Sequence, residues 1–117
     1  MKQDNKLIGQ LSETMAADYL TGKGFILLER NFGNKFGEID IIAQDQDTLV
    51  FVEVKAKTGI TYGPPEEMIT PGKLAKIRHI ADLYLKDQKL PCRIDVVAIV
   101  LDEHHQLIRL THYPNVY

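Results

Sequence analysis

Residues 37–55 read GEIDIIAQDQDTLVFVEVK, and the order of apolar and polar residues in this stretch largely sets the expected fold. Two runs rich in Ile and Val, residues 37–43 and 49–54, flank the polar residues 44–48. Short β-prone runs separated by a few polar residues are typical of a β-hairpin. The stretch therefore predicts two antiparallel strands joined by a short loop.

Side chains alternate between the two faces of a strand, so each predicted strand has one aliphatic face. The members of these faces are Ile39, Ile41 and Ala43 on the first strand and Val50, Val52 and Val54 on the second. The opposite faces carry the polar residues, among them Glu38 and Asp40 on the first strand and Glu53 and Lys55 on the second.

The register of the hairpin brings two carboxylates together. If residues 45–48 form a four-residue loop, Gln44 pairs with Leu49, and Asp40 lies directly across from Glu53 on the same face. Cross-strand neighbours of this kind have Cβ atoms about 5 Å apart. Because like charges side by side destabilise a sheet, such a pair needs a raised pKa, a nearby cation or open water.

Two adjacent carboxylates and a lysine are suited to metal-assisted chemistry on phosphate. Mg²⁺ takes oxygen ligands, typically one or two protein carboxylates with water and substrate phosphate. Asp40 and Glu53 fit this requirement, and Lys55 can orient or deprotonate a water or neutralise charge on phosphate. The same residues also fit the solvated polar face of an ordinary hairpin, and the residues alone leave both interpretations open.

Elements predicted on either side of the hairpin indicate a mixed sheet with helical cover. A helix with an apolar stripe is expected first, then a strand; after the hairpin, a helix that begins at Thr70-Pro71 precedes two more strands. The expected ranges are 7–21 for the first helix and 25–29, 94–101 and 107–112 for the strands. The predicted class is α/β with a mixed sheet, in the order α-β-β-β-α-β-β.

Length and composition exclude several classes of protein. With 117 residues, 44% of them hydrophobic, the chain is expected to form a single domain over residues 1–117. The only cysteine, Cys92, cannot form a disulfide framework, and no apolar run is long enough to span a membrane. We therefore expect a soluble, cytoplasmic protein that does not associate with membranes.

The charge distribution points to one basic region. The chain has 14 Lys and Arg against 16 Asp and Glu, a net charge of −2, but residues 55–93 hold eight basic and four acidic side chains. Four of the basic residues are candidates for binding a phosphate backbone. They are Lys57, Lys73, Lys76 and Arg78, although Arg78 is equally suited to pair with an acid such as Asp95.

Two aromatic residues are further candidates for contact with a nucleic acid. Phe36 and Tyr62 can stack on nucleobases, as aromatic residues near single-stranded substrates do. Packing in the core or in a loop is the simpler interpretation of both residues.

The stretches GEID, residues 37–40, and EVK, residues 53–55, resemble the core of the PD-(D/E)xK nucleases, whose elements follow the order α-β-β-β-α-β. More closely, the chain resembles the YraN-type bacterial family of predicted endonucleases, which is related to RecB-like nucleases and archaeal Holliday junction resolvases. The resemblance covers nearly the whole chain. Its stretches are residues 9–13, 16–20, 30–31, 37–43, 49–55, 63–70 and 93–98.

The resemblance implies a restriction-endonuclease-like fold and a site at which Asp40 and Glu53 bind Mg²⁺ or Mn²⁺. In it, the carbonyl of Val54 is a third ligand, Lys55 is the catalytic lysine, and Glu13 is a further catalytic and metal-binding acid. The implied activity is endonucleolytic cleavage of DNA, branched or otherwise structured, with a homodimer as the working form.

The chain departs from the family pattern at three positions. Gly33 and Gly72 stand where an arginine is common, and Leu74 stands where a glutamine or basic residue often opens the second helix. These departures favour an alternative, a nucleic-acid-binding module that keeps the nuclease fold with little or no turnover. A protein-interaction domain with a merely polar sheet face is a third interpretation.

Overall fold

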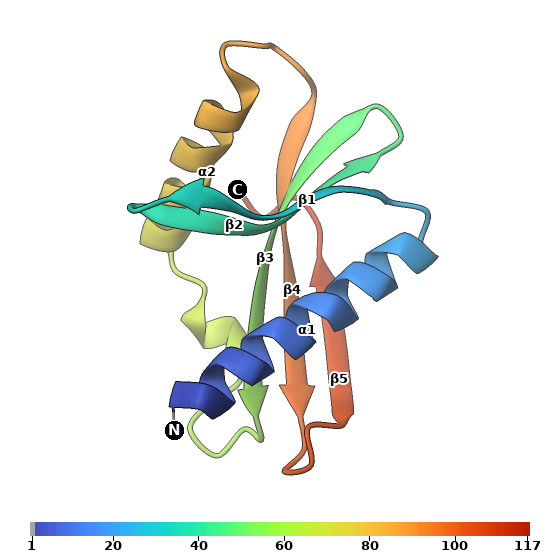
Figure 1. Cartoon of the computed structure of the whole chain (residues 1–117), viewed down its shortest axis with the longest axis vertical. Helices are drawn as coiled ribbons and strands as arrows, with labels where there is room; N and C mark the ends of the chain where they lie inside the picture. Colours follow the sequence, from blue (N-terminus) through green and yellow to red (C-terminus); the bar gives the residue numbers. More distant parts are fainter. Residues whose placement is uncertain (1) are drawn as a thin grey trace.

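The computed structural model of the chain describes the backbone of residues 2–117 and the side chains of residues 5–117. These residues form a five-stranded sheet and two long helices (Figure 1). In chain order the elements are α1 (Lys2–Gly22), β1 (Ile26–Asn34), β2 (Gly37–Asp45), β3 (Thr48–Thr58), the short 3-10 helix η1 (Pro65–Met68), α2 (Pro71–Leu85), β4 (Cys92–Leu101) and β5 (Leu107–Tyr113).

The strands lie in the order β1-β2-β3-β4-β5. Pairing is antiparallel except between β3 and β4, which are parallel and joined through α2. The mixed sheet and the α-β-β-β-α-β core expected from the sequence are therefore confirmed. A fifth strand, β5, follows the core at one edge of the sheet.

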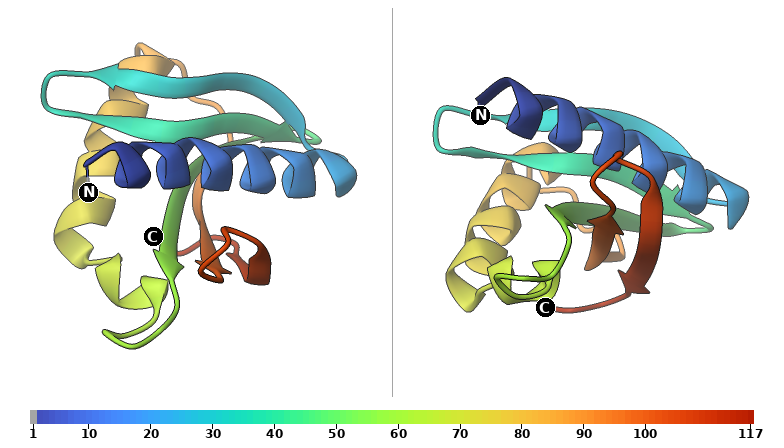
Figure 2. Two further views of the ribbon diagram at one scale, coloured as in Figure 1. Left: turned by 60° about the horizontal axis from the view of Figure 1, so that its bottom comes forward. Right: turned by 90° about the horizontal axis from the view of Figure 1, so that it is seen from below.

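The two long helices cover opposite faces of the sheet, as the views in Figures 1 and 2 show. Ala16, Ala17 and Leu20 of α1 pack on aliphatic residues of β2, β3 and β4, and we call this cluster the α1-side core. Ile77 and Ile80 of α2 pack on the other face, in a cluster that we call the α2-side core. Burial on both faces explains why β4 reads as an almost unbroken aliphatic run.

The β2–β3 hairpin has the predicted register. Gln44 pairs with Leu49, but Asp45 and Thr48 also pair, so the connection is a two-residue turn instead of the expected four-residue loop. Gln46 allows this tight turn by adopting a positive φ of 57°. The pairing of the two strands ends in the other direction at Ile41 and Val52.

The expected grouping of Ile39 with Ile41 and Ala43 is wrong. Ile41 and Ala43 belong to the α1-side core, whereas Ile39 lies in the α2-side core. On the N-terminal side of Ile41, β2 does not pair with β3, and the β1–β2 ribbon turns away across the sheet (Figure 1). Two-stranded ribbons twist more strongly than wider sheets, so simple alternation fails along this segment.

Element ends differ from the sequence-based ranges by a few residues. The first strand, expected over residues 25–29, extends to Asn34, which pairs with Gly37. The helix start at Thr70-Pro71 is confirmed, since the Thr70 hydroxyl accepts a hydrogen bond from the Lys73 amide at 3.2 Å. No helix in residues 2–117 is both long and apolar enough to cross a membrane.

Candidate functional site

The predicted carboxylates meet where β2 and β3 separate, and we call this opening between Asp40 and residues 53–55 the strand fork. The Val54 amide donates to Asp40 Oδ2 at 2.7 Å, in place of a bond to a neighbouring strand. The N–H and C=O of one strand residue point to the same edge. The Val54 carbonyl therefore also faces the fork.

Glu53 and Lys55 lie side by side at the fork. Lys55 Nζ is 3.2 Å from Glu53 Oε1, and only 8% of the Glu53 surface is exposed. Burial acts to lower the pKa of Lys55, but the neighbouring Glu53 carboxylate outweighs it, so that the pKa is raised. The Lys55 side chain is therefore an ammonium ion at neutral pH.

Asp40 is the acid whose ionisation the surroundings oppose. Burial, and after it the charge of Glu53, raises the pKa of Asp40 to about 7, while the hydrogen bond from Val54 acts in the opposite direction. This shift is the behaviour that the sequence predicts for two facing carboxylates without a metal ion. A divalent cation between the two acids would offset their repulsion and abolish the rise in the pKa of Asp40.

The donor set of the fork fits a hard cation that brings some of its own ligands. Asp40, Glu53 and the Val54 carbonyl supply oxygen atoms, the ligand type that Mg²⁺ and Mn²⁺ prefer. Among the residues described by the structure, no three His, Cys, Asp or Glu side chains lie close enough together to hold a metal ion. Water and substrate phosphate would have to complete the coordination shell.

Glu13 reaches the same region from α1, but its direct partners come from β1. Its Oε1 lies 3.7 Å from Arg30 Nη2, and the Asn31 amide nitrogen, in the orientation that its neighbours require, donates to the same oxygen at 2.9 Å. Burial raises the pKa of Glu13, while Arg30 opposes this effect. The charge of Glu13 also acts on Asp40, which places it at the border of the fork.

The contacts of Arg30 and Asn31 with Glu13 were not predicted from the sequence. Asn31 adopts a left-handed backbone conformation with φ of 57°, which Asn tolerates better than most residues. The signal that was available for these positions is the resemblance itself, because residues 30–31 form one of its stretches.

A groove of about 410 Å³ runs between α1 and the outer part of β3. Its lining residues are Asn5, Ile8, Gly9, Ser12, Glu13, Val54, Lys55, Ala56, Lys57 and Met68. The Ser12 hydroxyl is buried without a hydrogen-bond partner within the described side chains. Lys57 lies along the groove and donates to the Tyr62 carbonyl at 3.1 Å.

The basic residues predicted on α2 lie on two different sides of that helix. Burial and the charge of Lys55 lower the pKa of Lys73, so Lys73 is a neighbour of the fork. Lys76 follows one turn later and is exposed. Arg78 is paired with Asp82, Nε to Oδ1, at 3.4 Å on the side facing away from Lys76.

The suggested pairing of Arg78 with Asp95 does not form. Asp95 is fully buried and is bound instead by Arg93 at 2.9 Å and by His112 at 2.8 Å. These partners lie on β4 and β5.

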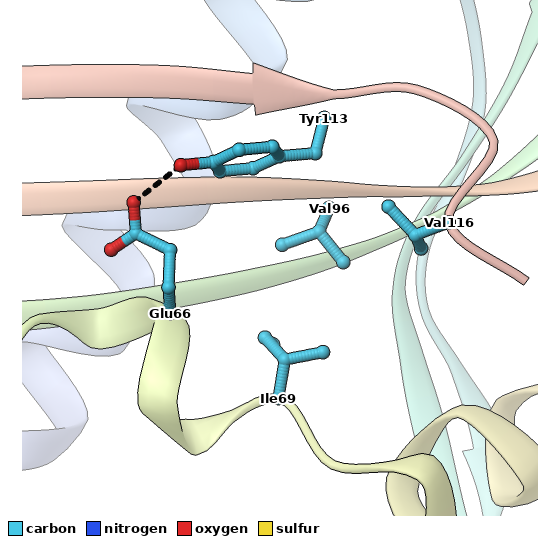
Figure 3. Close-up of a pocket in the computed structure, with 5 residues that line it drawn as sticks. All are labelled: Glu66, Ile69, Val96, Tyr113 and Val116. Atoms are coloured by element: carbon cyan, nitrogen blue, oxygen red, sulfur yellow. Dashed lines mark hydrogen bonds between the residues drawn. The ribbon is translucent and has the colours of Figure 1, made fainter.

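The segment that follows the site strand is fastened to β5 (Figure 3). Glu66 in η1 accepts a hydrogen bond from the Tyr113 hydroxyl at 2.6 Å and two from Arg109, at 2.7 and 3.1 Å. The bonds from Arg109, and secondarily that from Tyr113, lower the pKa of Glu66 to about 2. This anchor holds the connection between Lys57 on β3 and the first turn of α2, both of which border the fork.

These features define a class: an α+β protein whose mixed sheet splits between two strands and presents two acids and a lysine at the split. The chain belongs to the uncharacterised protein family UPF0102, whose sequence profile matches residues 12–99. Every predicted site residue, from Glu13 to Arg78, lies within the matched range.

Similar proteins cover the chain over most or all of its length. A UPF0102 protein of Pelotomaculum thermopropionicum is 41% identical over 120 aligned positions, which cover all of both chains. One from Dictyoglomus turgidum is 38% identical over 97% of this chain and 99% of its own. One from Clostridium botulinum is 48% identical over 84% of this chain and 83% of its own.

Proposed function

We propose that the protein is a metal-dependent endonuclease that hydrolyses phosphodiester bonds of DNA, with branched or otherwise structured DNA as its substrate. The observation that carries the proposal is the strand fork, where Asp40, Glu53 and the Val54 edge supply oxygen ligands beside the Lys55 ammonium. In this proposal the protein works in the cytoplasm, and two copies act together, because a four-way junction requires two symmetric cuts.

The residues of the fork have separate tasks in this reaction. Asp40, Glu53 and the Val54 carbonyl hold Mg²⁺ or Mn²⁺, which when bound supplies Lewis-acid activation of water and neutralises charge on the phosphate. Lys55 carries a raised pKa, so its ammonium orients the attacking water or stabilises the phosphate and does not act as a base. Glu13 positions a water or a second ion at the border of the fork.

Basic residues around the fork hold the substrate. Lys73 borders the fork on α2, Lys76 continues the same side of the helix, and Lys57 lies along the groove on β3. Contacts of lysines to phosphate position DNA without reading its sequence. Arg78 stands apart from them, because it is paired with Asp82.

A DNA-binding module with little or no turnover is the second candidate, and Gly33 supports it. A Cβ atom at Gly33 would lie 2.2 Å from the Gly37 carbonyl oxygen, so no side chain fits this backbone. The arginine common at this position in the family pattern therefore has no equivalent here. A site without that charge would bind phosphate less tightly and polarise it less.

The first test is calorimetric titration of Mn²⁺ into the wild-type protein and Asp40→Asn. Asp47→Asn is the matched control, because it makes the same change at an exposed position in the turn of the same hairpin. We expect wild type and Asp47→Asn to bind the metal and Asp40→Asn to lose binding by at least about tenfold.

Cleavage of a labelled four-way junction in the presence of Mg²⁺ then separates the two candidates. If the protein is an endonuclease, wild type and Asp47→Asn cleave the junction and Asp40→Asn does not. If it is a binding module, all three proteins bind the junction and none cleaves it. Equal metal affinity in wild type and Asp40→Asn would refute the assignment of the fork as the metal site.

A further inference from the structure

Phe36, at the tip of the β1–β2 hairpin, is exposed where the sequence favoured packing. Its surface is 70% exposed, although it is an aromatic residue in a short turn between two strands. A single exposed apolar residue needs no explanation by itself. The surroundings of Phe36, however, are those of a binding site.

The backbone of the hairpin tip is held firmly. The Phe36 amide donates to the Asn34 side chain, Oδ1, at 2.8 Å. Gly37 has a φ of 147°, and a Cβ atom there would lie 3.2 Å from Ile80 Cδ1, so the tip lies directly against α2. Figure 2 shows the hairpin end beside this helix. The Phe36 ring is therefore presented to solvent from a fixed position, which lowers the entropy cost of stacking a ligand on it.

A groove of about 540 Å³ lies where the hairpin tip meets the exposed side of α2. Its lining residues are Phe36, Ala75, Lys76, His79 and Ile80. The groove thus has an aromatic and aliphatic surface with a basic rim and no acidic lining residue. A second cation is close, since Lys35 Nζ lies 5.2 Å from the centroid of the Phe36 ring.

A flat apolar surface with cations at its rim matches the chemistry of a nucleotide. The base offers an aromatic face for stacking, and its phosphate requires a positive partner. Phe36 also lies four residues from Asp40 on the hairpin, a span of roughly 13 Å along an extended chain. The groove is therefore a few nucleotides away from the strand fork.

We propose that Phe36 stacks on an unpaired nucleobase of the DNA substrate, with Lys35 and Lys76 beside its phosphate. The inference rests on the proposed function and specifies its substrate further. Bases inside a duplex are already stacked on one another, so the groove takes a base at a branch point, gap or single-stranded end. The protein then distinguishes DNA with unpaired nucleotides from continuous duplex.

The test measures DNA affinity in the Asp40→Asn background, which prevents cleavage under the proposed function. Phe36→Ala removes the ring, Phe36→Tyr retains it, and Ile108→Ala removes a comparably exposed apolar side chain on β5, far from α2. The probes are a single-stranded oligonucleotide carrying the fluorescent base 2-aminopurine and the fully paired duplex of the same sequence. Thermal unfolding of each variant confirms that it is folded.

We expect Phe36→Ala to weaken single-strand binding roughly 5- to 150-fold, the range for loss of one stacked base, with less than about twofold change for the duplex. Phe36→Tyr and Ile108→Ala should bind as the parent protein does. Quenching of 2-aminopurine fluorescence should accompany binding in the parent and in Phe36→Tyr and be lost in Phe36→Ala.

Three outcomes would overturn the inference, and they are distinguishable. Unchanged affinity in Phe36→Ala would show that the ring does not stack on DNA. Equal weakening for both probes would assign Phe36 a structural or non-selective role. If the parent protein binds neither probe, the proposed function fails and this inference fails with it, whereas the first two outcomes leave the proposed function intact.

Discussion

Asp40 interacts with both the Val54 amide and the charge of Glu53, and these two neighbours shift its pKa in opposite directions. The amide favours the carboxylate, whereas burial and Glu53 favour the protonated acid and prevail. Without a cation, the surroundings therefore disfavour the ionised form of Asp40. A metal ion would replace this proton, and metal affinity should increase with pH in the range where Asp40 titrates.

The raised pKa of Asp40 should make the free energy of unfolding depend on pH. An unfolded Asp loses its proton near pH 4, whereas folded Asp40 retains it to about pH 7. Between these values the folded state binds more protons than the unfolded state, so the free energy of unfolding falls as pH rises. Without divalent ions, we expect wild type to lose on the order of 2 kcal/mol relative to Asp40→Asn between pH 5 and pH 8.

Urea unfolding of both proteins across this pH range measures the difference. In saturating Mg²⁺, the loss of unfolding free energy by wild type relative to Asp40→Asn between pH 5 and pH 8 should disappear, because the bound cation keeps Asp40 ionised in the folded state. Parallel pH profiles for wild type and Asp40→Asn would mean that Asp40 titrates normally. Asp47→Asn serves again as the exposed control.

At the scale of elements, the basic residues of α2 lie on two different sides of the helix. Lys73 and Lys76 are three residues apart and share a side, while Arg78 lies two residues beyond Lys76 and faces another way. Only the first side borders the strand fork and the groove beside Phe36. The helix is therefore expected to contact DNA through one side only.

Salt dependence of DNA binding tests this division. Each lost phosphate contact should reduce the slope of log affinity against log salt concentration by about 0.7 to 0.9. We expect Lys73→Ala combined with Lys76→Ala to reduce the slope by about 1.5, and Arg78→Ala to leave it nearly unchanged. A similar change from Arg78→Ala would show that DNA reaches both sides of α2.

The elements also show how far the sequence could predict this protein. The pairing of Gln44 with Leu49 and the Thr70 cap follow from local patterns and are confirmed, although a two-residue turn replaces the expected four-residue loop. The reversal at Ile39 and the contacts of Asn31 were not predictable in this way. They depend on where β2 leaves β3, which is decided by packing between elements far apart in the chain.

For the candidate site, the sequence predicted the residues better than it predicted their arrangement. Asp40 lies near Glu53 and Lys55, as expected, but the predicted direct pairing of Asp40 with Glu53 is wrong, because the β2–β3 pairing stops at Ile41 and Val52 and Asp40 instead accepts from the Val54 amide. The approach of Lys73 to Lys55 required knowledge of the path of α2. Arg78 has the same charge as its neighbours, and only the helix orientation shows that it lies apart.

At the scale of the whole molecule, a second buried charged group, Asp95, stabilises the fold. Asp95 is 0% exposed and joins Arg93, His112 and the Asn115 amide, the last at 2.9 Å. It thereby ties β4 to β5 and to the C-terminal residues.

Removing this carboxylate should destabilise the entire fold. We expect Asp95→Ala to lower the free energy of unfolding by about 3 to 5 kcal/mol, because it removes the buried carboxylate that Arg93, His112 and the Asn115 amide share and leaves Arg93 with Asp45 alone. Glu103→Ala, at an exposed turn position, should change it by less than about 0.5 kcal/mol. Urea unfolding measures both, and a small effect of Asp95→Ala would show that the buried charges contribute little.

The hydrogen bond between Val54 and Asp40 gives the molecule a natural spectroscopic reporter. Most backbone amides in the sheet bond to another strand, but the Val54 N–H bonds to a side chain whose charge depends on proton and metal. Its NMR resonance should therefore respond to occupancy of the strand fork while resonances in the middle of β4 remain still. One amide signal in an isotope-labelled sample thus allows the site to be followed without any substrate.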